Sequence, residues 1–141
     1  MNYTIEELKI GQTSSFSKTI TETDVYLFAG ITGDFNPAHI NAQYAANTQF
    51  KERIAHGMLS ASLISTILGT SLPGKGTIYL GQQVKFLSPV RLGDTITVTV
   101  KVKELVKEKN RVILHTFCAN QEGDLVVDGE ATVLAPITKC D

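Results

Sequence analysis

The sequence has little net charge, few cysteines and no long uninterrupted apolar run. Its formal net charge of −1 argues against nucleic acid as the main partner, because a surface that follows phosphates needs a basic excess. The two cysteines are Cys118 and Cys140, and Cys140 lies at a chain end. We therefore expect no structural disulfide and a reducing, cytoplasmic setting.

Membrane signals are also scarce. The first seven residues are polar and acidic, and they lack the apolar core of a signal peptide. The most apolar stretch, Met58 to Leu72, is interrupted by Ser, Thr and Gly. It is too short and too polar to span a bilayer, so we expect a buried helix there and no membrane insertion.

What is present is a normal globular composition. The chain has 141 residues, of which 43% are apolar and 19% charged. This length and balance predict one domain over residues 1–141 with a real hydrophobic core. No linker, repeat or low-complexity tract divides it.

The first half of the chain carries helix signals. The Ser/Thr-rich segment Gln12 to Ile20 suits an edge strand or a loop. Thr21 then resembles an N-cap, with Asp24 completing a loose capping box. Apolar residues follow at helical spacing, and Gly33 is suited to end the helix in a left-handed conformation.

Helix and strand signals then separate clearly. The segment Gly57 to about Gly69 is apolar and carries no charge, so it predicts a helix buried on most sides. After it the period changes to two, which indicates strands. We expect an antiparallel meander wrapped around that helix, which makes an α+β domain. The predicted strands are Thr77–Leu87, Thr95–Glu104, Val112–Ala119 and Leu125–Leu134.

The segment Gly33 to His39 contains the residues best suited to proton transfer. Pro37 cannot continue a helix from upstream, so Asp34 to Pro37 must form a turn. Such a turn brings Asp34 and His39 together around one water, whereas a regular helix would not. Asn36 is suited to fix the turn through hydrogen bonds to the backbone.

Hydration of a double bond beside a thioester needs this kind of acid–base pair. It also needs a donor for the charge that develops on the thioester oxygen. A free backbone amide at a helix N-terminus meets that need, and Gly57 opens the uncharged helix.

Other interpretations of the same residues stay open on the sequence alone. The Gly-Asp-Phe-Asn-Pro segment is also a good structural turn. His56 is open to three roles, as a ligand, as a base or as a cap of the helix that follows, and the cap is favoured. Ser65 is suited to serve as a small packing residue. His115 falls within a strand and is expected on a sheet face. A metal site built from histidines and Asp34 would not match any standard ligand spacing.

Several motifs together resemble the MaoC-like dehydratases, specifically the short (R)-specific enoyl-CoA hydratases. The resemblance covers nearly the whole chain, and it departs from the usual pattern at Ala38, where a larger aliphatic residue is common. The matching stretches are Thr32–Asn41 with Tyr44-Ala45-Ala46, then Ile54-Ala55-His56-Gly57-Met58-Leu59, Leu72–Gly76, Tyr79–Gln82, Lys85–Val90 and Gly93-Asp94.

The resemblance implies a hot-dog fold, a homodimer, an acyl-CoA substrate and no cofactor or metal. It implies reversible syn hydration of a trans-2-enoyl-CoA to an (R)-3-hydroxyacyl-CoA of short to medium chain length. The implied roles are Asp34 and His39 as catalytic residues, Gly57 as oxyanion hole, Asn36 and Ser65 as supporting residues, and Leu68 and Val133 as limits of the acyl pocket.

Three alternatives accompany this interpretation. A thioesterase on the same fold would hydrolyse acyl-CoA, but it needs no second group near the α-carbon, so the pair favours the hydratase. A binding module would need no proton-transfer groups. A dehydratase acting on acyl carrier protein thioesters differs only in the carrier. Basic candidates for coenzyme A phosphates are Lys51, Arg53, Lys75 and Arg91.

Overall fold

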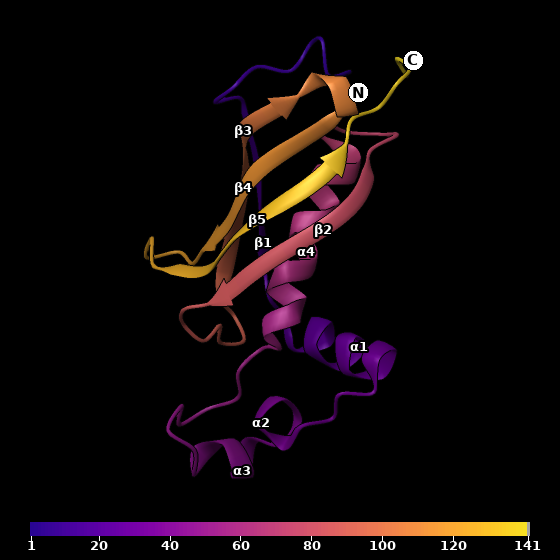
Figure 1. The fold of residues 1–141 in the computed structure, drawn as a ribbon. Helices are drawn as coiled ribbons and strands as arrows, with labels where there is room; N and C mark the ends of the chain where they lie inside the picture. The colour runs from indigo at the N-terminus through magenta and orange to yellow at the C-terminus, as the bar shows by residue number, and fades with distance from the viewer. Residues whose placement is uncertain (141) are drawn as a thin grey trace.

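A computed structural model describes residues 1–140, and its centre is a helix lying against one face of a curved antiparallel sheet (Figure 1). Both chain ends lie at one end of the sheet, and the three shorter helices gather at the other end. The elements in chain order are β1 (Thr13–Thr19), α1 (Glu22–Thr32), α2 (Pro37–Ile40), α3 (Ala42–Ala46), α4 (Gly57–Thr70), β2 (Ile78–Phe86), β3 (Thr95–Val106), β4 (Arg111–Ala119) and β5 (Leu125–Leu134).

The sheet has five strands in the order β1-β3-β4-β5-β2. The α+β hot-dog architecture is thus as predicted, but the expectation of a single meander is wrong for β2. That strand pairs antiparallel with β5 at the far edge and not with β3, which follows it in the chain. Because α4 runs along the face of the sheet, the chain leaves β1 at one edge and re-enters at the other.

The core forms between the alternating strands and the apolar side of α4. On β3, the predicted inward residues Ile96, Val98, Val100 and Val102 are all buried. Their period-two spacing places them on one face, as the sequence predicts. The α4 residues Leu59, Ile64, Ile67 and Leu68 meet the sheet in the same cluster.

The opposite side of α4 is more open than predicted. Ser62, Ser65, Thr66 and Thr70 are exposed in the single chain. Two of these hydroxyls form hydrogen bonds within the helix. Ser62 donates to the Met58 carbonyl at 2.6 Å, and Thr70 donates to the Thr66 carbonyl. The absence of charge on this helix therefore does not mean that one chain buries all of its sides.

Local capping chemistry builds the helical segment as predicted. Thr21 and Asp24 form the expected capping box of α1, and Gly33 ends that helix with φ of +79°. Asn36 accepts a hydrogen bond from the Ala38 N–H at 3.0 Å. Its cap starts the one-turn helix α2, which carries His39 and which the sequence interpretation treated only as the end of a turn.

The thiols and the helix lengths complete the description. Cys118 is buried and Cys140 is partly exposed, and both are free. Burial raises the pKa of the Cys118 thiol to about 12. Within residues 1–140, no helix has the length and apolar character needed to cross a membrane.

Replacing Ile64 by Ala tests the packing of α4. This side chain is fully buried between helix and sheet, so its truncation leaves a cavity and should lower the free energy of unfolding by about 2–5 kcal/mol. Ile137, which is 84% exposed, provides the matched control. Ile137→Ala should change the free energy of unfolding by less than about 0.5 kcal/mol. Urea unfolding at one fixed protein concentration measures both, and equal losses would contradict the described packing.

Candidate active site

A cavity of about 690 Å³ opens where the N-terminus of α4 meets the end of β2 and the α1–α2 segment. Its wall is mainly apolar, as expected for a site that holds an acyl chain or another apolar group. Asp34, His39 and His56 are the titratable residues among its lining. The apolar part of the wall includes Phe28, Phe50, Met58, Phe86, Val126 and Val127.

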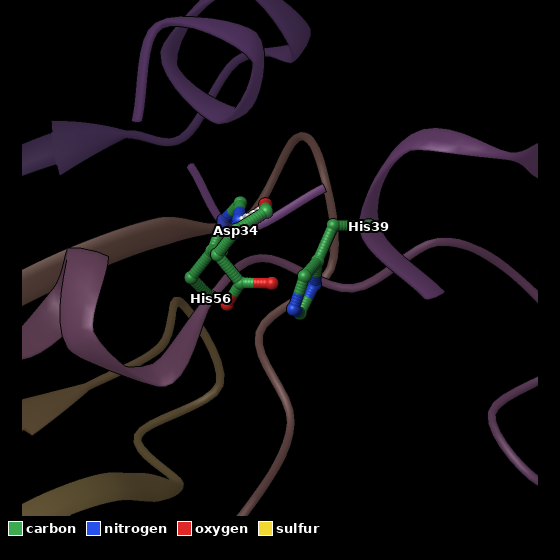
Figure 2. Close-up of side chains that lie close together, drawn as sticks. All are labelled: Asp34, His39 and His56. Carbon is green, nitrogen blue, oxygen red and sulfur yellow. Dashed lines mark hydrogen bonds between the residues drawn. The ribbon is translucent and has the colours of Figure 1, made fainter. Parts of the chain in front are cut away.

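Asp34 and His39 lie together at this cavity, as the turn between them predicts. Asp34 is exposed in the loop after α1, while His39 on α2 is only 8% exposed. One carboxylate oxygen of Asp34 and one ring nitrogen each of His39 and His56 lie within 4.8 Å of one another (Figure 2). A water with hydrogen bonds of about 2.8 Å can bridge two atoms at such a separation.

A backbone carbonyl fixes the orientation of His39. Its Nδ1 lies 2.7 Å from the carbonyl oxygen of Ile54. Because a carbonyl only accepts hydrogen bonds, Nδ1 must carry the hydrogen. In the neutral imidazole, Nε2 is therefore the nitrogen whose lone pair can accept a proton.

His56 does not play the capping role expected of it. It occupies the N-cap position of α4, but its side chain makes no capping hydrogen bond. Its Nε2 instead lies 2.9 Å from the backbone oxygen of Asp34, and its ring stacks on His39 with centroids 3.9 Å apart. The burial of the ring against two aromatic neighbours directs its N–H away from the helix terminus and towards the loop.

Gly57 lies beside the pair, as an oxyanion donor would. It begins α4 and lines the cavity. The first N–H groups of a helix have no partner within the helix, and the helix dipole favours negative charge there. A side chain at this position would be crowded, because a Cβ would lie 2.8 Å from the ring of Phe86.

The three-residue cluster is poorly shaped for a metal ion. One nitrogen of each histidine already faces a carbonyl oxygen. The two rings are stacked with an interplanar angle of 28°, and the other nitrogen of His56, Nδ1, is buried, whereas a metal site needs accessible ligand atoms arranged around one ion. The geometry therefore favours acid–base chemistry, and the absence of a metal requirement stays a prediction.

Comparison with known proteins identifies the family of the chain. The family model described as a MaoC like domain matches residues 6–119. An (R)-specific enoyl-CoA hydratase of Rhodospirillum rubrum is 56% identical over 93% of this chain and 90% of its own. The chain belongs to the MaoC-like family.

Two solved structures share the fold of this MaoC-like chain. An unliganded R-hydratase from Pseudomonas aeruginosa is 50% identical, with a TM-score of 0.92 over 99% of this chain and 93% of its own. The (R)-hydratase from A. caviae, described as involved in PHA biosynthesis, is 45% identical, with a TM-score of 0.91 over 93% of this chain and 99% of its own.

Four residues that the sequence analysis considered for the site lie away from the cavity in this chain. Ser65 is exposed on α4, about 12 Å from Gly57 along the helix axis at 1.5 Å per residue. Leu68 and Val133 are buried in the core and do not line the cavity. His115 lies on a sheet face, as predicted, and pairs with Asp128 at 2.6 Å. The site roles of Ser65, Leu68 and Val133 remain predictions from the family resemblance.

Two of the candidate phosphate-binding cations are engaged elsewhere. Arg53 lies 2.6 Å from Glu22, and this contact lowers the pKa of the Glu22 carboxyl. Arg91 donates to the Phe50 carbonyl at 2.8 Å and lies 3.3 Å from Glu52. Both arginines therefore join loops to neighbouring segments.

Sequence reasoning missed the groups that orient the pair. The Ile54 carbonyl carries no signal in the sequence, because any residue supplies one. The position of Phe86 over Gly57 depends on the pairing of β2 with β5, which the sequence did not reveal. The sequence contains the His56-Gly57 pair, but the hydrogen bond from His56 to Asp34 joins positions far apart in the chain.

A methyl group at residue 57 should disturb the site more than the fold. In Gly57→Ala the new Cβ displaces the flexible ring of Phe86 into the cavity, and kcat/KM for the family reaction should fall by about tenfold or more. The matched control is Gly30→Ala, because that helical glycine has open space around it. Adding Phe86→Leu to Gly57→Ala should recover part of the loss, and full activity of Gly57→Ala alone would contradict this view of the site.

Proposed function

We propose that the protein is an (R)-specific enoyl-CoA hydratase that reversibly hydrates trans-2-enoyl-CoA to (R)-3-hydroxyacyl-CoA. The observation that carries the proposal is the placement of Asp34, His39 and Gly57 on one mainly apolar cavity. The similarity to hydratases over nearly the whole chain supports it. We further propose that the acyl chain is of short to medium length.

The chemistry follows from three groups. One water lies between Asp34 and His39 and loses a proton to this pair as its oxygen bonds to carbon 3 of the enoyl group. The electron pair of the double bond moves towards the thioester, and the Gly57 N–H stabilises the charge that develops on the carbonyl oxygen. The pair then delivers a proton to carbon 2. Because both proton-transfer groups lie on one side of the substrate, the addition is syn.

The presence of two proton-transfer groups favours this reaction over thioester hydrolysis. Hydrolysis needs attack on the carbonyl carbon and leaves the proton donor to carbon 2 without a purpose. Two groups within reach of one water suit an addition in which one proton leaves and another arrives. A role in fatty acid metabolism and in supplying hydroxyacyl-CoA for polyester synthesis fits such a product, and free thiols fit a cytoplasmic location.

Two features of the single chain support a homodimer. Strand β2 forms an edge of the sheet and carries a single charged residue, Lys85. Ile78, Leu80 and Phe86 on this strand are each between 46% and 56% exposed. A long apolar edge is a template for pairing with another strand, and the open, uncharged side of α4 offers a second contact surface. We propose that a second copy covers both.

The product identifies the reaction. Purified protein incubated with crotonyl-CoA should consume the enoyl-thioester absorbance and yield (R)-3-hydroxybutyryl-CoA on chiral analysis. It should release CoA from saturated butyryl-CoA no faster than a blank. An (S) product, or rapid thiol release without hydration, would refute the proposal. Parallel assays with the acyl carrier protein thioester identify the preferred carrier.

The same assay examines the catalytic pair. Asp34→Asn and His39→Gln each remove proton transfer while keeping the size of the side chain. Each should lower kcat by about 10²–10⁴-fold, the usual contribution of general acid–base catalysis. His115→Gln, on the far face of the sheet, is the control and should keep wild-type kinetics. Near-wild-type turnover by either folded pair variant would exclude that residue from catalysis.

The dimer is tested by mass in solution. Light scattering after size exclusion should give twice the chain mass of 15.3 kDa. A charge at the apolar edge, Leu80→Asp, should shift the equilibrium to monomer. Ile10→Asp introduces the same charge at a 63% exposed site ahead of β1 and should leave the dimer intact. A wild-type monomer at micromolar concentration would rule the dimer out.

A further inference from the structure

His56 joins three parts of the site through one side chain. Its imidazole is 2% exposed and lies between the ring of His39 and that of Phe28, whose centroid is 5.0 Å away. Its Nε2 donates to the Asp34 carbonyl oxygen at 2.9 Å (Figure 2). The residue itself immediately precedes Gly57. One residue therefore links the loop of Asp34 and the face of His39, through its ring, with the start of α4, through its backbone.

The hydrogen bond from His56 ties Asp34 itself to the start of α4. The other hydrogen bonds of Asp34 within residues 1–140 are local, with Thr32 at 3.2 Å and Asn36 at 3.1 Å. Local bonds shape the turn but do not fix it against another element. The bond from His56, 22 positions away in sequence, is the one that does so.

The polarity of His56 shows that filling space is not its only role. Its Nδ1 is buried and has no hydrogen-bond partner within residues 1–140. Buried polar atoms are normally paired, so a phenylalanine would fill the same space without an unpaired nitrogen. The N–H directed at Asp34 and the flat face against His39 are together what an imidazole supplies here.

Direct contact with the reacting atoms does not fit the position of His56. Its Nε2 hydrogen is bound to the Asp34 carbonyl, and its Nδ1 is shielded from solvent. Neither nitrogen is free to exchange a proton with a water in the cavity. Its influence must pass through the groups it touches.

We propose that His56 is a positioning residue that holds the Asp34 carboxylate in register with His39 and with the Gly57 amide. The hydrogen bond fixes the loop, and the stacked ring sets the plane of His39, whose other restraint is the Ile54 carbonyl. Proton transfer depends steeply on such alignment, since an error of about 1 Å can cost about 10²-fold in rate. The inference rests on the proposed hydratase activity.

Two substitutions separate the two contacts. His56→Gln keeps an N–H donor near the place of Nε2 but loses the stacked ring, whereas His56→Phe keeps the ring but loses the donor. Each should lower kcat for crotonyl-CoA by about 10- to 100-fold, and His56→Ala should lower it further. KM and the dissociation constant for saturated butyryl-CoA, measured by calorimetry, should change by less than about threefold, because His56 positions catalytic groups and not the substrate. His115→Gln and His115→Phe are matched controls with expected wild-type values.

The outcomes are decisive in each direction. If His56→Gln and His56→Phe both keep wild-type kcat, the positioning role is excluded while the hydratase assignment stands. A loss of butyryl-CoA affinity that parallels the loss of kcat also overturns the positioning role, because His56 would then maintain the cavity. Unfolding of all three variants at assay temperature overturns it too, because His56 would then maintain the fold. Failure of the wild-type protein to hydrate crotonyl-CoA would instead refute the proposed function itself.

Discussion

The packing of α4 against the sheet is the contact on which the rest of the molecule depends. Ile64, Ile67 and Leu68 are almost fully buried against the strands, and burial of such side chains is the main source of stability in a domain of this size. No charged group has to lose its hydration for this to happen, because α4 carries none. Since the helix is held along its length, its first turn is held too. The position of Gly57 and of His56 beside the cavity is therefore a consequence of the core.

The same composition explains why one chain looks incomplete. The hydroxyl-bearing side of the uncharged helix is exposed in the single chain, and the neighbouring strand β2 presents apolar residues at an open edge. Such an edge is a liability unless something covers it. A second copy would cover both surfaces at once, because they belong to consecutive elements of the chain. Because the edge and the helix are neighbours in the chain, a second copy is the simplest partner for both surfaces.

The sequence predicted most elements because their signals are local. The capping box at Thr21, the left-handed Gly33 and the alternation along β3 each involve residues a few positions apart. The place of β2 beside β5 was not predictable in this way, because period-two patterns specify a face and not a partner. At the site, the proximity of Asp34 and His39 was predictable because one turn brings them together. The role of His56 was missed because its partner lies in another segment, and a dipeptide does not reveal what its side chain will reach.

The way His39 is oriented says why Asp34 belongs to the pair. In many acid–base sites a buried carboxylate lies behind the histidine and stabilises the imidazolium that forms. Here the atom behind His39 is a neutral carbonyl oxygen, that of Ile54. Among the described residues that line the cavity, Asp34 is the one carboxylate. In the proposed hydration, the negative charge that balances a protonated His39 would therefore come from Asp34, on the other side of the attacking water. In the proposed mechanism the two residues act as one unit, so their relative position matters more than the exact place of either, and this relative position is what His56 restrains in its proposed positioning role.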